Sequence, residues 1–331
     1  MNVIWRRPKI TVAIALLLSP LLLYISLSSL RGVAGGYKAV VTRFATEDGT
    51  SYGPATQIAR LENMSVKESS GVAASRTQTS ILWTHNDSGD GPFIYAFDRQ
   101  GRHRGVWKVA GAQAIDWEDM AIGPGPDRRV SYIYIGDIGD NAQRRDHVII
   151  YRVAEPRADA SSPSSTTQSP LNTAAAEVFR LRYADGKHDA ETLMVHPTTG
   201  DLYIVTKVMG GAAGIYKLKA PFFKTGISTL ARVGEVRFPN AMGGFITGGD
   251  ISPDGQRVIL CDYLGACEIR LPKKRGVAFD EIWKQSLTQV DVGSRRQGEA
   301  ICYRADGLAL LATSEGVPCP LIEVSRSQKK R

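Results

Sequence analysis

Acidic residues recur at one position of a repeated sequence pattern, and carboxylate oxygens are the ligands that hard cations prefer. In each copy, an acid begins a short apolar segment, which a turn joins to a second apolar segment ending on a polar residue. The five acids are Glu68, Glu118, Glu191, Asp250 and Glu299. If the copies surround one axis, these carboxylates converge, and like charges about 4–6 Å apart raise one another's pKa.

A bound cation would relieve this repulsion, as would shared protons or a basic partner. Because the set holds oxygen ligands and no soft ones, the sequence predicts a Ca²⁺ site, with Mg²⁺ disfavoured by its stricter geometry. The alternative is structural: the acids would accept hydrogen bonds from backbone amides where strands begin. Five acids in the same phase favour the metal or ligand site.

A second set of polar residues ends the second segment of each copy: Asn86, Asp137, Lys207, Asp262 and Glu315. The loops THNDSGD (84–90) and GDIGDN (136–141) add further candidate ligand-binding residues, which are His85, Asp87, Asp140 and Asn141. Such loops either coordinate Ca²⁺ or form Asx turns. The second loop does not match the twelve-residue EF-hand pattern.

Two functions fit these residues. The first is a binding or scaffold module whose Ca²⁺ ties the repeats together, with a small anionic ligand or a carbohydrate as its partner. The second is a Ca²⁺-dependent hydrolase in which Asp137 or Asp262 activates water and Lys207 binds the anion of a phosphoester. A glycosidase would instead use two of the carboxylates. We find no GxSxG, P-loop or zinc motif.

The elements that must position these residues are short strands rich in Val, Ile, Leu and Tyr, bounded by turn residues. Each copy holds three strands, and a fourth precedes the next acid. The last copy lacks its fourth strand, and residues 55–63 supply one at the other end of the chain. We therefore predict an all-β fold, a five-bladed β-propeller over residues 36–326 in which the N-terminal strand closes the last blade.

Two other architectures remain open. Six blades would result if residues 37–44 begin another unit. The second alternative is a two-sheet sandwich, which is less favoured because it would not explain an acid at the same phase of each copy. In a propeller, the first strand of each blade lines the channel, so both polar sets would gather at one mouth.

Residues 1–35 form a basic flank, an uncharged apolar run and a small-residue segment, which indicates a signal peptide or a signal anchor. The body is then exported, either secreted or periplasmic, or held to a membrane by this segment. The formal charge of +8 resides at the two chain ends, including the basic tail 327–331. The neutral body excludes a broad nucleic-acid footprint, and we expect a monomer.

The exported location permits disulfides among the four cysteines, Cys261, Cys267, Cys302 and Cys319. Buried thiols are the alternative, and no CxxC pair supports zinc.

The strings THNDSG, DWEDMA, GDIGDN, DAETL and GEAI resemble a family of exported bacterial propeller proteins over residues 65–320. The resemblance implies the propeller fold and the exported location, and it implies no particular activity. The five-bladed plan with an axial acid per blade is similar to calcium-activated nucleotidases in architecture. Esterase-like and phytase-like propellers share the acidic channel mouth.

Overall fold

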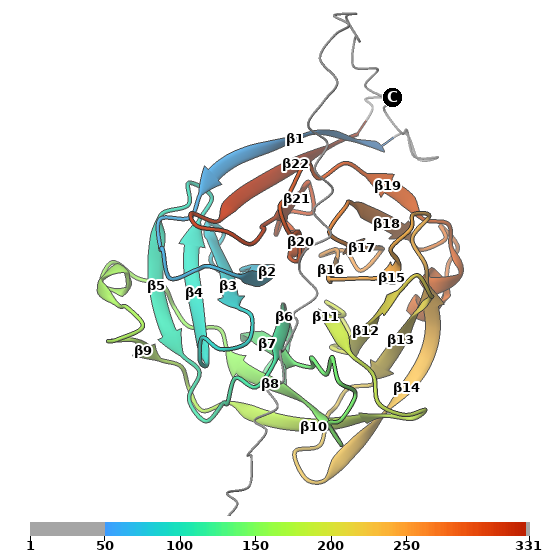
Figure 1. Ribbon diagram of the computed structural model, residues 1–331, viewed down its shortest axis with the longest axis horizontal. Coiled ribbons are helices and arrows are strands. Elements are labelled where there is room, and N and C mark those ends of the chain that lie inside the picture. The colour runs from blue at the N-terminus through green and yellow to red at the C-terminus, as the bar shows by residue number, and fades with distance from the viewer. Residues whose placement is uncertain (1–49, 329–331) are drawn as a thin grey trace, which may run out of the picture. The chain divides into compact units, whose positions relative to one another are not determined.

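The computed structural model describes residues 50–328, and strands dominate this part of the chain (Figure 1). The helical segments within it are two short 3-10 helices, η1 (Ser162–Ser164) and η2 (Phe279–Lys284). The fold is therefore all-β, as predicted, with many sheets that include a nearly closed, barrel-like one, and it is compatible with a propeller. The predicted targeting segment 1–35, the additional strand considered at 37–44 and residues 329–331 of the basic tail lie outside the described residues.

Four sheets follow the predicted copies of the sequence pattern. The first has the order β2 (Ser69–Ala74), β3 (Ile81–Asn86), β4 (Phe93–Asp98), β5 (His103–Lys108) and β9 (Leu171–Asn172). Another has the order β16 (Gly248–Ile251), β17 (Arg257–Cys261), β18 (Ala266–Arg270) and β19 (Thr288–Val290). A further one joins β20 (Ile301–Tyr303), β21 (Ala309–Ala312), β22 (Pro320–Gln328) and β1 (Thr50–Arg60).

The largest sheet contains two copies of the pattern joined at their outer strands. Its first half runs through β6 (Trp117–Pro124), β7 (Ser131–Asp137), β8 (Val148–Ala154) and β10 (Glu177–Tyr183). Its second half runs through β11 (Ala190–Val195), β12 (Leu202–Met209), β13 (Ala213–Leu218) and β14 (Ile227–Val236), with β15 (Gly243–Phe245) paired to β12. The parallel pairing of β10 with β14 connects the halves.

The five innermost strands contact one another in a closed circle. Strand β2 contacts β6 and β20, β6 contacts β11, and β16 contacts both β11 and β20. Figure 1 shows these strands around a common centre, with the later strands of each sheet farther out. The predicted acids lie at or near the starts of these inner strands, so this arrangement decides which of their side chains meet.

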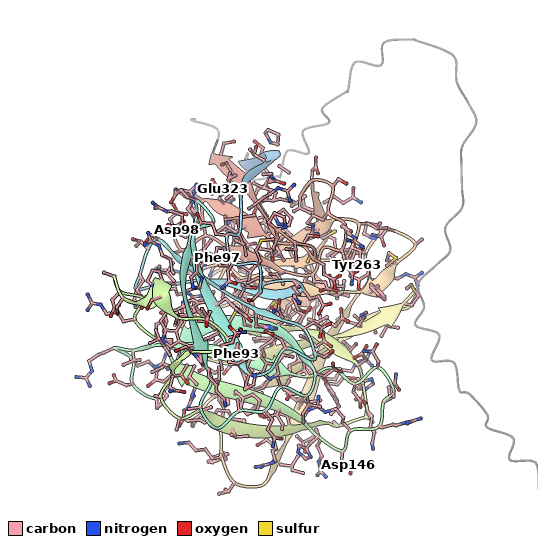
Figure 2. The ribbon with its side chains drawn as sticks, turned by 60° about the vertical axis from the view of Figure 1, so that its left-hand side comes forward. Phe93, Phe97, Asp98, Asp146, Tyr263 and Glu323 are labelled. Carbon is pink, nitrogen blue, oxygen red and sulfur yellow. The ribbon has the colours of Figure 1, made fainter. Side chains whose placement is uncertain are left out.

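Packing between neighbouring sheets explains why strands near the centre are buried along their whole length. Strands β3 and β11 are buried at every position because sheets lie against both of their faces. The outer strand β10 alternates between buried and exposed side chains along its second half. Trp83, Trp107 and Trp117 fill the core between β2–β5 and β6–β8. Phe97 and the partly buried Phe93 belong to the core shared with β21 and β22 (Figure 2).

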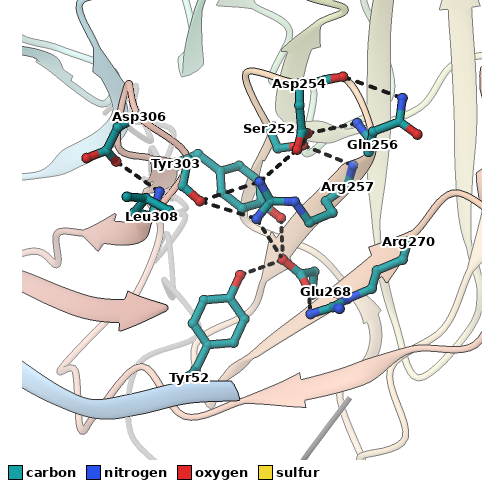
Figure 3. Close-up of polar contacts among 11 residues, drawn as sticks. Tyr52, Ser252, Asp254, Gln256, Arg257, Glu268, Arg270, Tyr303, Asp306 and Leu308 are labelled. Atoms are coloured by element: carbon teal, nitrogen blue, oxygen red, sulfur yellow. Dashed lines mark hydrogen bonds and ion pairs between the residues drawn. The ribbon is translucent and has the colours of Figure 1, made fainter. Parts of the chain in front are cut away.

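The N-terminal strand completes the sheet of the last three strands, as the sequence predicts. Strand β1 pairs antiparallel with β22, and Ala55 lies opposite Val324. Tyr52 of β1 also donates a hydrogen bond from its hydroxyl to Oε1 of Glu268 in β18, the neighbouring sheet (Figure 3). The first and last described strands, β1 and β22, are thus paired with each other, and Tyr52 links them to the adjacent sheet.

The cysteines are buried free thiols rather than disulfides. Cys261, Cys267, Cys302 and Cys319 are all unpaired and buried. Burial raises the pKa of each of the four thiols. The sequence left disulfides and buried thiols as alternatives, and the structure contains buried thiols.

Candidate functional site

Glu118 and Glu191 occupy the same place at the start of their strands. The register between β6 and β7 shifts at Glu118, and the register between β11 and β12 shifts at Glu191. Each glutamate is therefore the extra residue of a β-bulge, a feature that re-aims a side chain. Both glutamates are buried, as is Glu299 just before β20. Lys207 pairs with Glu191 through its Nζ. Burial raises the pKa of Glu118 and Glu299, and the charge of Lys207 acts against this larger effect. Three of the five predicted acids thus gather around one lysine.

Asp250, which the sequence groups with the glutamates, does not share this place, because β16 pairs with β17 in regular register. It lies inside β16, and its two carboxylate oxygens accept hydrogen bonds from the backbone N–H groups of Ile251 (2.8 Å) and Tyr303 (2.9 Å). The side chain therefore fastens β16 to β20. Asp119 fastens β6 to β11 in the same way, accepting from the N–H of Leu193 at 3.0 Å.

Glu68 also lies away from the shared place. It precedes β2 and is exposed, and the bulge of β2 holds Ser70 instead. Ser70 donates its hydroxyl to the carbonyl oxygen of Glu118. Glu68 stays near the group of acids around Lys207 (Glu118, Glu191, Glu299 and Glu315), which we call the mouth, because its charge raises the pKa of Glu315.

A group of three carboxylates, which we call the carboxylate triad, consists of Asp87, Asp116 and Glu118. One oxygen from each lies within 4.8 Å of the others. Glu118 is 4% exposed. Within residues 50–328, no hydrogen-bond donor reaches the carboxylate of Asp116 or Glu118. Burial, together with Asp87, raises the pKa of Asp116 to about 6 and that of Glu118 well above its usual value.

Gly139 leaves the space that two members of the triad occupy. A Cβ atom at this position would lie 2.2 Å from Oε1 of Glu118 and 2.4 Å from Oδ2 of Asp116. Gly139, the second glycine of GDIGDN, therefore lets both carboxylates lie against the loop backbone. Any other residue at position 139 would displace these carboxylates, so the geometry of the triad depends on this glycine.

Lys207 lies in the middle of the mouth, where the sequence predicts a residue for binding an anion. Its ammonium group pairs with Glu191 and lies 4.6 Å from the ring centroid of Phe245. Burial raises the pKa of Asp189, and the charge of Lys207 opposes part of this rise. Lys207 is thus an internal cation that offsets part of the carboxylate charge.

The two predicted general bases hold loops in place. Asp137 is fully buried and accepts hydrogen bonds from the N–H groups of Ile115 (3.3 Å) and Asp116 (3.2 Å), and it pairs with Arg145 at 2.8 Å. Its oxygens are occupied by groups of its own loop. The arrangement positions Asp116 for the triad.

Asp262 is held in a similar way. Its carboxylate accepts from Asn240 Nδ2 at 2.7 Å and from the N–H groups of Leu264 (2.8 Å) and Gly265 (2.7 Å). It is fully buried. The turn that it caps carries Tyr263 to the mouth.

The other predicted ligand-binding residues divide between loop contacts and the mouth. His85 is fully buried beside Trp117, and burial lowers the pKa of its imidazole. Asn86 accepts from the N–H of Glu68 at 3.1 Å. Asp140 accepts from the N–H groups of Arg144 and Arg145, and Asn141 is exposed. Asn86 and Asp140 thus have the turn-forming role that the sequence left open.

Glu315 belongs to a second polar group in the mouth. Gln297 Nε2 donates to Glu315 Oε1 at 2.7 Å and to Glu299 Oε1 at 3.0 Å. Tyr263 joins this group through its hydroxyl, which lies 3.2 Å from Glu299 Oε1. Glu299, predicted as a metal ligand, is therefore joined to Glu315 rather than to the triad.

Sequence reasoning missed several residues of the mouth. The predicted site residues do not include Asp116 or Asp189, yet each lies two positions before a bulge glutamate, in DWE and DAE. Residues two apart in an extended segment tend to share a side, and this spacing is a usable signal. Gln297 and Tyr263 carry no such signal, because the turn after β17 and the segment before β20 bring them together.

Neither a protein-family model nor a curated protein matches the chain. The geometry of the mouth therefore carries the functional argument. A search of residues 50–328 also finds no helix with the length and apolar character needed to cross a membrane.

Proposed function

We propose that the chain is a five-bladed β-propeller whose channel is lined by β2, β6, β11, β16 and β20. The closed circle of contacts among these strands supports this arrangement, as does the completion of the last sheet by β1. Propellers repeat their sheets around a central channel and leave only short, protected edges. The basic flank and the apolar run within residues 1–35 support an exported location for this domain.

We further propose that the mouth binds one divalent cation, Ca²⁺, through Asp87, Asp116 and Glu118. The observation that carries this proposal is the approach of three carboxylate oxygens within 4.8 Å while Glu118 is almost fully buried. Hydrogen bonds from the described residues do not compensate Asp116 or Glu118. A hard cation with oxygen ligands offsets such repulsion, and Gly139 leaves room for the carboxylates to converge.

The proposed ion joins two sheets. Asp87 follows β3, whereas Asp116 and Glu118 lie at the start of β6. A cation between them would tie the first sheet to the second on the mouth side. This favours a binding or scaffold module in which the ion orders the mouth. The hydrogen bonds of Asp137 and Asp262 to their own loops give no comparable support to a hydrolase.

Calorimetric titration of Ca²⁺ into the full-length chain, freed of metal with a chelator, tests the proposal. We expect one ion per chain and a loss of at least tenfold in affinity for Glu118→Gln. Asp127→Asn is the matched control, because Asp127 is an exposed acid paired with Arg129 in the turn at the other end of β6. Equal Ca²⁺ affinity in the Glu118→Gln variant and the wild type would refute the site.

A further inference from the structure

The group around Gln297 combines carboxylates with aromatic rings, and we call it the aromatic–carboxylate wall: Phe245, Tyr263, Gln297, Glu299 and Glu315. The rings of Phe245 and Tyr263 are 5.1 Å apart, in an edge-to-face arrangement. Gln297 and Tyr263 both donate to Oε1 of Glu299, and Gln297 also donates to Glu315. The five side chains thus form one contiguous unit beside the carboxylate triad.

The second oxygen of Glu299 has no such donor. Glu299 is 5% exposed, and its Oε2 has no hydrogen-bond partner within residues 50–328. A buried acceptor without a donor is costly, and more so when it is charged. The wall therefore contains a buried acceptor that a proton or an entering cationic donor would satisfy.

The charges around the wall are mostly negative. Glu68, Asp87 and Glu299 all act on the half-buried Glu315 and, together with burial, raise its pKa to about 7. The exposed Arg296 opposes this effect. An anion would be repelled here, and a cation would be attracted.

Lys207 shows which cation this chemistry suits. Its ammonium group pairs with Glu191 and lies over the ring of Phe245, which is the combination of carboxylate and aromatic face that organic ammonium ions prefer. The outer part of the wall repeats this combination with Tyr263 and Glu315. No ammonium group within residues 50–328 pairs with those two side chains.

We propose that the aromatic–carboxylate wall binds an organic alkylammonium ion. The ammonium would donate to the carboxylates of Glu315 and Glu299, and its alkyl chain would lie along Tyr263 and Phe245. An ammonium group carries three donors and no acceptor, which matches a wall made of acceptors and rings. This site is separate from the proposed Ca²⁺ site, and either one can exist without the other.

The probe is 1,5-diaminopentane, titrated calorimetrically into the Ca²⁺-saturated full-length chain at pH 8, where Glu315 is mostly ionised. We expect the diamine to bind and pentane-1,5-diol and glutarate to give no heat. Glu315→Gln should weaken the diamine at least tenfold. Glu281→Gln is the control and should leave it unchanged, because Glu281 is an exposed partner of Lys284 in η2.

Two further variants separate this proposal from the Ca²⁺ site. Asp116→Asn should lose Ca²⁺ and keep the diamine, whereas Glu315→Gln should do the reverse. Tyr263→Phe should keep most of the diamine affinity, and Tyr263→Leu should lose it, since only the former retains the ring. No diamine binding, or diamine binding that Asp116→Asn abolishes and Glu315→Gln leaves intact, would overturn the proposal.

Discussion

Two buried groups of charged side chains, the carboxylate triad and the network around Glu268, resolve the same electrostatic problem in opposite ways. Glu268 is fully buried between β18 and the sheet of β20–β22. It accepts hydrogen bonds from the hydroxyls of Tyr52 and Tyr303 and from Nε of Arg270 at 2.7 Å (Figure 3). Arg257 adds a second positive charge at 3.8 Å. Donors from three strands surround this one carboxylate.

In the carboxylate triad, by contrast, negatively charged groups face one another. Its three carboxylates lie together, and Glu118 is about as buried as a core residue. Lys207 acts on Glu118 and Arg145 acts on Asp116, but these cations are already paired with Glu191 and Asp137. Glu268 is thus held by donors of the protein itself, whereas the described residues supply no hydrogen-bond donor to the carboxylates of Asp116 and Glu118 in the triad.

The largest expected effect separates the two regions directly. Glu268→Gln removes the negative charge beside the guanidinium groups of Arg257 and Arg270, and loss of one partner from a buried pair costs about 3–5 kcal/mol. Glu118→Gln in chelator should leave stability unchanged or raise it, because it removes repulsion. Urea unfolding of both variants checks this, and the distinction between the regions fails if both lose stability to the same extent.

A smaller effect concerns pH. The pKa of Asp116 is raised to about 6 in the folded protein, so its contribution to the stability of the metal-free protein falls as pH rises through 6. Ca²⁺ binding needs the ionised form and should therefore weaken as pH falls, by about tenfold per unit below pH 6 for one displaced proton. Titrations between pH 5 and pH 8 measure this, and a constant affinity across that range would contradict it.

The smallest expected effect concerns Asp250, the acid that the sequence groups with the glutamates. Asp250→Asn should leave Ca²⁺ affinity unchanged, because the side chain fastens β16 to β20. Stability should fall by about 1–2 kcal/mol, as one of two charge-assisted hydrogen bonds is weakened. Calorimetry and urea unfolding of one preparation test both parts, and a loss of Ca²⁺ binding would return Asp250 to the metal site.

The sheets were predictable because each strand is a short apolar run bounded by turn residues. The pairing of β1 with β22 was also predictable, since the last copy of the pattern lacks a strand that residues 55–63 supply. These signals lie within short stretches of sequence, so they can be recognised without knowledge of the tertiary structure. The predicted copies are present in four sheets, although one sheet holds two copies and the strands β9 and β15 were not predicted.

The site was only partly predictable, because its geometry depends on where a bulge falls. Glu118 and Glu191 lie on bulges, whereas Asp250 lies in regular register and points to other partners. A shift of one residue in an extended strand reverses the side on which a side chain lies. Spacing alone cannot reveal such a shift, nor the contact of Gln297 with Tyr263 across two loops.

Terbium luminescence tests the central claim about the triad most directly. Tb³⁺ takes the oxygen ligands of Ca²⁺ and emits when a nearby excited tryptophan transfers energy to it, and the buried Trp117 lies between Asp116 and Glu118 in the sequence. With tryptophan excitation, we predict emission that Ca²⁺ displaces and that is lost in Glu118→Gln. Undiminished emission from the Glu118→Gln and Asp116→Asn variants would contradict the account.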